Sequence, residues 1–198
     1  MSFVDPYFDK TIGDLRNLLG AKSSKELHEL EPQIVFANEL ELESINIPGT
    51  NDLSELLNIH AQLFKGVFDW AGKIRTVDIK KNSASSDYFL IVSKITDASD
   101  YVFNQLAKEN FLKNLQKDIF IDRLAYFYDQ LNYIHPFREG NGRVQRVFWS
   151  RVAKDAGYEI NWNKVVGDEN DEASRVAAEN LDLSLLKKMF SRIVKPTE

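Results

Sequence analysis

Residues 135–146 read His-Pro-Phe-Arg-Glu-Gly-Asn-Gly-Arg-Val-Gln-Arg, and this stretch decides how the rest of the chain is interpreted. The proline and the two glycines predict a loop in its first half. From Arg143 the pattern becomes helical, and Gly157 predicts the helix end. The apolar residues at helical spacing are Val144, Val147, Phe148 and Val152. A glycine-rich turn that leads into a helix presents free backbone N–H groups and the positive end of the helix dipole, so the stretch predicts an anion-binding site.

The charged side chains of the same stretch suit a polyphosphate ligand. Arg143 and Arg146 are three residues apart, so both point from one face of the predicted helix. Glu139 precedes the turn and is placed to bind Mg²⁺ on the same phosphates. His135 supplies a base whose ordinary pKa is near neutrality. The structural alternatives are a surface histidine, solvated arginines and a helix-capping glutamate. We favour a phosphate site because all four groups fall within twelve residues.

The stretch resembles the signature of the Fic (Fido-fold) family, His-x-Phe-x-(Asp/Glu)-Gly-Asn-Gly-Arg-x-x-Arg. Every fixed position is matched, by His135, Phe137, Glu139, Gly140, Asn141, Gly142, Arg143 and Arg146. Residues 67–75, Val-Phe-Asp-Trp-Ala-Gly-Lys-Ile-Arg, also resemble the family at the expected distance upstream. The resemblance therefore covers residues 50–193 as a Fic core, with residues 1–49 as a helical N-terminal extension of the same domain.

The resemblance implies a protein adenylyltransferase that moves AMP from ATP to a hydroxyl side chain of a target protein. It implies that His135 deprotonates the hydroxyl and that Glu139 coordinates Mg²⁺. It also implies an anion hole and two phosphate-binding arginines, formed by Gly140, Asn141, Gly142, Arg143 and Arg146, and a core anchor at Phe137. The residues alone indicate the anion site and the base, whereas the choice of phosphate follows from the family alone.

Length and composition favour one soluble cytoplasmic domain. The 198 residues are 43% hydrophobic and 28% charged, and they include no cysteine. No cysteine means no disulfide and no cysteine-based metal site, which fits a reducing compartment. There is no apolar run long enough for a membrane span and no secretory signal pattern at the N-terminus. A net charge of −5 argues against a direct nucleic-acid-binding surface.

Most of the chain has helical spacing, so the predicted fold class is all-α with one β-hairpin. In the first part of the chain, helices are expected at 11–20, from a cap at Ser23 or Ser24 to Leu42, and from a cap at Asp52 to Gly66. The second of these has a start or kink near Pro32. The later helices are expected at 96–108, at 117–133, from Arg143 to Gly157, at 170–179 and at 182–193. His28 and His60 lie in helical patterns without phosphate-binding neighbours, so we assign them structural roles.

Residues 75–92 are the exception to the helical pattern. Residues 75–79 alternate polar and apolar side chains, 82–87 have turn chemistry, and 88–92 are rich in β-formers. They predict a hairpin that packs against the helices. The hairpin could be a mere connector. The family resemblance instead implies a flap that aligns the target by adding it as a strand beside the active site.

One family pattern is absent from the sequence. Many Fic enzymes carry an inhibitory helix with the pattern (Ser/Thr)-x-x-x-Glu-(Gly/Asn), whose glutamate pairs with the second arginine, here Arg146. None of the glutamates followed by Gly or Asn has Ser or Thr four residues before it. The resemblance then implies the toxin of a toxin–antitoxin pair, with the glutamate supplied by a separate small helical protein. The implied targets are type II topoisomerases, DNA gyrase or topoisomerase IV.

Two other functions compete with this interpretation. Some Fic relatives transfer UMP or phosphocholine, and the Doc branch transfers phosphate. The Doc pattern has lysine at the second glycine of the motif, so Gly142 argues against that branch. A non-catalytic interaction module is the alternative from another class, and the complete set of motif residues argues against it.

Overall fold

The computed structural model describes residues 5–42, 44–80 and 89–197 of this mainly helical protein. The helices are α1 (Ser24–Leu42), α2 (Leu53–Leu63), α3 (Ile95–Lys108), α4 (Lys117–Ile134), α5 (Asn141–Asp155), α6 (Glu169–Asn180) and α7 (Ser184–Ile193), with short 3₁₀ turns at Val92–Lys94, Asn110–Leu112 and Trp162–Lys164. Two antiparallel strand pairs accompany them, β1 (Phe8–Asp9) with β2 (Asp14–Leu15) and β3 (Tyr158–Ile160) with β4 (Val194–Pro196). No helix within the described ranges has both the length and the apolarity that a membrane crossing requires.

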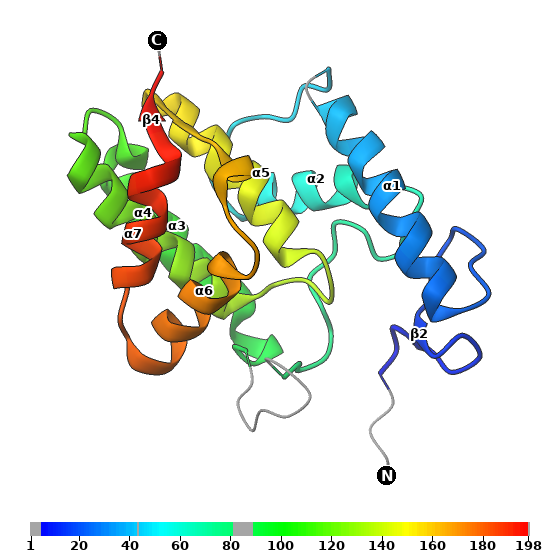
Figure 1. Ribbon diagram of the computed structural model, residues 1–198. Coiled ribbons are helices and arrows are strands. Elements are labelled where there is room, and N and C mark those ends of the chain that lie inside the picture. The colour runs from blue at the N-terminus through cyan, green and yellow to red at the C-terminus, as the bar shows by residue number, and fades with distance from the viewer. Residues whose placement is uncertain (1–4, 43, 81–88, 198) are drawn as a thin grey trace.

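Figure 1 shows α1 and the β1–β2 pair at one edge of the molecule, α3, α4 and α7 at the other, and α5 between them. α5 packs against both α2 and α4, and α4 also packs against α3 and α7. Phe120, Leu124, Phe127 and Leu131 recur at helical spacing in the sequence, which predicts one apolar stripe, and all four side chains are fully buried in α4. Each such side chain contributes about 1.5–3 kcal/mol to folding. The loop that follows α4 therefore starts from a helix that is firmly packed in the core.

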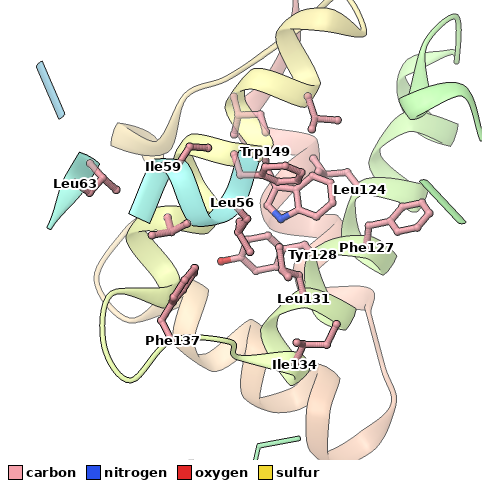
Figure 2. Close-up of a cluster of buried hydrophobic side chains, with 14 of the residues drawn as sticks. Leu56, Ile59, Leu63, Leu124, Phe127, Tyr128, Leu131, Ile134, Phe137 and Trp149 are labelled. Carbon is pink, nitrogen blue, oxygen red and sulfur yellow. The ribbon is translucent and has the colours of Figure 1, made fainter. Parts of the chain in front are cut away.

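The core continues from α4 into the motif loop. Figure 2 shows Phe137 of the loop in one cluster with Leu131 of α4 and Leu56 of α2, with Trp149 of α5 above them. All four side chains are at most 1% exposed. The loop between α4 and α5 is thus anchored in the core and does not lie free on the surface.

Two predicted helix caps are confirmed. The Ser23 hydroxyl accepts from the Glu26 N–H, at 3.2 Å, and the Asp52 carboxylate accepts from the Glu55 N–H, at 3.1 Å. The expected start or kink near Pro32 does not divide the helix, because α1 runs as one helix through that residue.

The helix predicted over 11–20 is wrong. The segment begins in the tight turn between β1 and β2, contains β2, and continues as irregular chain. Local hydrogen bonds explain the difference. The Asp9 carboxylate accepts from the Thr11 N–H, the Asp9 carbonyl accepts from the Gly13 N–H, and Gly13 has φ of +72°. Short acidic side chains that bond to nearby backbone favour turns over helix.

The regular strands predicted over 75–79 and 88–92 are wrong for the part of the chain that the structure describes. Leu90 donates its N–H to the Tyr133 carbonyl, and Val92 already begins a 3₁₀ turn. Among the described residues, the backbone bond that joins the two sides runs from Phe89 N to Ile79 O, at 3.1 Å. The predicted turn residues 82–87 lie outside the described residues, so the flap at 75–92 stays a prediction.

Candidate active site

His135 lies directly after α4 and has left-handed backbone dihedrals, φ 49° and ψ 62°. Its N–H still donates to the Leu131 carbonyl, which ends the helix. Its Nδ1 lies 3.1 Å from the Asn132 carbonyl oxygen. A carbonyl can only accept, so Nδ1 carries the ring proton and Nε2 keeps a free lone pair. This is the tautomer that a general base needs.

Burial sets the protonation state of His135. Desolvation lowers the pKa of this imidazole to about 4, the bond to the Asn132 carbonyl opposes the shift, and the nearby Arg75 charge adds to it. The pKa is therefore lower than the near-neutral value expected from the sequence. At neutral pH the ring is uncharged and ready to accept a proton.

Phe89 covers the imidazole. Its ring stacks on His135 with centroids 3.6 Å apart and planes 11° from parallel. The described residues that follow the predicted turn thus lie beside the motif loop, held there by the bond from Leu90 N to Tyr133 O at 3.1 Å.

Arg75 joins this segment to the motif loop. Its side chain is buried and donates to three carbonyls: Nε to His135 at 2.9 Å, Nη1 to Val77 at 2.7 Å, and Nη2 to Leu90. Its backbone N–H also donates to the Pro136 carbonyl, at 2.9 Å. One guanidinium therefore fixes both ends of the 77–90 segment against the residue that carries the base. Sequence reasoning placed Arg75 at the end of the second family segment and at the start of a predicted strand, but assigned it no role in the site.

His60 of α2 is a second residue that the sequence did not assign to the site. It is fully buried between the rings of Phe64 and Phe137, with centroids at 4.6 and 3.9 Å. The Gly72 N–H donates to its Nδ1 at 2.7 Å, so Nε2 carries the proton and donates to the Glu139 carbonyl at 3.2 Å. Burial lowers the pKa of His60 to about 4, which keeps it neutral. His60 has a structural role, as expected, and that role is to bind the backbone of the motif loop.

The Asn141 side chain is also used inside the loop. Its Oδ1 accepts from the Phe137 N–H at 2.9 Å, and its Nδ2 donates to the Phe137 carbonyl at 2.8 Å. Both ends of the buried amide are therefore used to hold the loop.

The two motif glycines are required for different reasons. Gly140 has φ of +81°, and a Cβ there would lie 2.1 Å from Phe64 Cζ, so no other residue fits. At Gly142 a Cβ would meet no protein atom within 4 Å. Gly142 lies in the first turn of α5, where backbone N–H groups have no helical partner. It also lines a cavity, so a side chain there would fill space next to those donors.

The charged residues of the motif divide into two groups. Arg143 pairs with Glu31 of α1 at 2.6 Å and with Glu139 at 3.4 Å. Arg146 has no ion pair among the described residues, and it lines the cavity together with His135 and Gly142. The cavity therefore gathers the predicted base, one predicted glycine and one predicted arginine, whereas Glu139 and Arg143 lie outside its lining.

The cavity has a volume of about 400 Å³, which suits a small-molecule ligand. The wall opposite the motif residues is formed by α6, which sequence reasoning did not connect to the site. The wall and the remaining lining are formed by Phe89, Tyr128, Asn132, Tyr133, Asn170, Asp171, Ser174, Arg175, Ala178 and Glu179. The Tyr128 hydroxyl donates to the Asn170 side-chain oxygen at 2.9 Å and ties α6 to α4. No local signal in residues 169–180 indicates this contact.

Glu139 has the chemistry of a one-carboxylate magnesium ligand. Its side chain is about half exposed, and Oε1 accepts from the Gly140 N–H at 2.8 Å. Within the described ranges no cluster of three acidic or histidine side chains could hold a metal ion. A cation here would depend on this carboxylate, on phosphate oxygens and on water. Mg²⁺ is commonly bound in that way, so the residues present fit it.

The helical fold, the histidine after α4 and the glycine turn that opens α5 define a Fic domain. Residues 50–153 match the Fic/DOC family, and the chain belongs to that family. It is 38% identical over 170 residues to the protein adenylyltransferase VbhT of Bartonella schoenbuchensis, covering 86% of this chain but only 35% of that protein. It is 32% identical to the probable protein adenylyltransferase Fic of Escherichia coli, covering 96% of this chain and 92% of the relative.

A solved structure shows the same fold. The N-terminal Fic domain of a VirB-translocated Bep effector protein from Bartonella quintana, solved with bound ADP, matches with a TM-score of 0.90 at 26% identity. The match covers 97% of this chain and 95% of that one.

Proposed function

We propose that this chain is a protein adenylyltransferase that transfers AMP from ATP to a hydroxyl side chain of a target protein. The observation that carries the proposal is the His135 imidazole, whose Nε2 is unprotonated and which shares one cavity with Gly142 and Arg146. The names of the VbhT and E. coli relatives support the type of reaction.

The proposed reaction is one displacement at phosphorus. His135 Nε2 takes the proton of the target hydroxyl, and the hydroxyl oxygen forms a bond to the α-phosphorus of ATP. The bond from that phosphorus to the oxygen that bridges to the β-phosphate breaks, and pyrophosphate leaves. The proton on His135 then passes to solvent, which restores the neutral base.

The first turn of α5 would stabilise the negative charge of the phosphates. Its backbone N–H groups lack helical partners, and the positive end of the helix dipole adds to them. Arg143 and Arg146 would bind the β and γ phosphates, because a guanidinium matches phosphate oxygens with two parallel hydrogen bonds. The nucleoside would occupy the cavity between α4 and α6. The ADP bound by the Bartonella quintana domain supports a nucleotide ligand here.

Glu139 would hold Mg²⁺, which neutralises phosphate charge when bound. Its carboxylate is already turned toward the α5 N-terminus by the bond from the Gly140 N–H. Because the side chain is about half exposed, the phosphates and water can complete the coordination of a cation.

The finer proposal is a cytoplasmic toxin that a separate antitoxin silences. Within the described residues no carboxylate pairs with Arg146, and the sequence lacks the inhibitory pattern, so a partner could supply a glutamate to this arginine. Such a glutamate would take the guanidinium away from the γ phosphate. Type II topoisomerases, DNA gyrase or topoisomerase IV, are the proposed targets.

The test is incubation of the purified chain with Mg²⁺, a bacterial lysate and ATP labelled at the α-phosphate. A labelled protein band is expected, and His135→Ala should reduce it about 10²–10⁴-fold while ADP binding persists. UTP labelled at the α-phosphate and ATP labelled at the γ-phosphate are the matched probes for UMP and phosphate transfer. No labelled protein from ATP, with active-site binding of ADP intact, would contradict the proposed reaction.

Expression tests the toxin proposal. The chain alone should inhibit bacterial growth, and His135→Ala should not. Arg146→Ala should lose activity and also weaken inhibition by a co-expressed small helical partner, because both use the same guanidinium. Normal growth with the active chain would overturn the toxin proposal and leave the transferase intact.

A further inference from the structure

A carboxylate from the N-terminal part of the chain reaches the motif. Glu31 lies on α1, outside residues 50–153 that match the family, and is only 8% exposed. Its Oε1 lies 2.6 Å from Arg143 Nη1, and this is the shortest contact of that guanidinium. The second contact, from Nη2 to Glu139, is 3.4 Å long and involves a half-exposed side chain.

Arg143 is fixed from two directions. The Phe64 ring lies under the guanidinium, with Arg143 Cζ 4.8 Å from the ring centroid, and the Glu31 carboxylate forms an ion pair with Nη1. The Glu31 contact is a close ion pair without the alignment of a hydrogen bond, because Glu31 Oε1 has no hydrogen-bond donor among the described residues. A planar guanidinium has five N–H donors, so donors of Arg143 remain for a phosphate. Without these contacts the long arginine side chain would have to be ordered when the ligand binds, which costs free energy.

The helix that carries Glu31 is itself anchored. Asn38 of α1 is buried, and its Nδ2 donates to the carbonyls of Leu63 and Lys65, at 3.0 and 2.9 Å, where α2 ends. α1 packs against α2, and α2 packs against α5. Glu31 therefore stands at a fixed position relative to Arg143.

We propose that Glu31 is a positioning residue, which holds the Arg143 guanidinium in place for the phosphates beyond the α-phosphate. The proposal rests on the proposed function, since it assigns a support to one of its phosphate-binding groups. It predicts that loss of Glu31 weakens the binding of some nucleotides and not of others. ATP and ADP carry phosphates that Arg143 would bind, whereas AMP does not.

The experiment is calorimetric binding of ATP, ADP and AMP to the full chain and to Glu31→Gln. Affinity for ATP and ADP should fall about tenfold, the size expected when a close, largely buried ion pair is lost, and affinity for AMP should not change. Glu29→Gln is the matched control on the same helix, because Glu29 is exposed and pairs only loosely with Lys25, at 3.8 Å. It should bind all three nucleotides as the unmodified chain does.

A double-mutant cycle with Arg143→Ala separates positioning from a general structural role. In that background Glu31→Gln should have no further effect on ADP affinity. Glu31→Asp, which keeps the charge, should recover part of the ADP affinity, and it replaces Glu31→Gln if that variant does not fold.

Three results would overturn the role of Glu31: unchanged ADP affinity in Glu31→Gln, tighter ADP binding, or an equal loss for AMP. These outcomes are independent of whether the unmodified chain transfers AMP. Failure of the proposed reaction shows instead as ADP binding without labelling of any protein.

Discussion

The Phe89 ring lies parallel to the His135 imidazole at 3.6 Å, so the residue that follows the predicted flap turn covers the proposed base. This contact removes water from one face of the ring. Since desolvation is the main cause of the low His135 pKa, Phe89 helps to keep the base neutral.

Replacing Phe89 with alanine should raise the His135 pKa from about 4 toward its ordinary value of 6.5. The base is active when neutral, so the acid limb of kcat/KM should move to higher pH. The measurement is the pH profile of target labelling. Ile91→Ala is the control, because Ile91 is a nearby exposed apolar residue. An unchanged acid limb in Phe89→Ala would show that the stacking does not set the pKa.

The two motif glycines should respond differently to alanine. Gly140→Ala forces a Cβ against Phe64 in a left-handed conformation, so it should destabilise the fold by several kcal/mol. Gly142→Ala meets no protein atom, so it should keep the stability but weaken ADP binding. Thermal unfolding and calorimetry measure the two effects. Normal ADP binding by Gly142→Ala would remove this residue from the anion site.

Arg75→Met should cost about 2–5 kcal/mol of stability, because it leaves the half-buried carbonyls of His135, Val77 and Leu90 without their donor. Target labelling should fall as well, since the base and the 77–90 segment are no longer joined. Urea unfolding measures the first effect. Lys73→Met, which removes an exposed bond to the Asp69 carbonyl, should change stability by less than about 0.5 kcal/mol.

His60 should make the protein sensitive to acid. Its pKa is lowered to about 4 in the folded chain and is 6.5 when unfolded, so the unfolded state binds the proton first as pH falls. Its contribution is fully present above about pH 6.5 and is lost toward pH 4, on the order of 3 kcal/mol.

The measurement is the free energy of unfolding between pH 7 and pH 4. His60→Gln can still donate to the Glu139 carbonyl but does not titrate, so it should lose less stability over this range than the unmodified chain. His135 titrates over the same range and supplies the remaining dependence. An identical pH dependence in His60→Gln would place the acid sensitivity elsewhere.

The sequence predicted those parts of the site that are set by residues close to one another along the chain. The loop, the helix that starts at the glycine turn and the buried stripe of α4 all follow from local pattern and are confirmed. The helix at 11–20 failed because aspartate side chains compete for the backbone, which apolar spacing does not record.

The contacts that support the loop are all distant in sequence. Arg75 is sixty residues from His135, and His60 is seventy-nine residues from Glu139. Glu31 and the α6 wall are likewise far from the motif residues that they meet. Helical spacing places such side chains on a buried face but does not say which loop they touch. The sequence therefore predicted that His60 is structural, but not that it binds the motif loop.

The α6 wall has a consequence for how this domain can diversify. It lies beyond residues 50–153, yet it forms one side of the cavity whose other side contains His135 and Arg146. The residues that would break a phosphate bond and the residues that would select what is attached to that phosphate thus belong to separate segments. Under the proposed function, substitutions in α6 should therefore change which group is transferred without touching the residues that carry out the reaction.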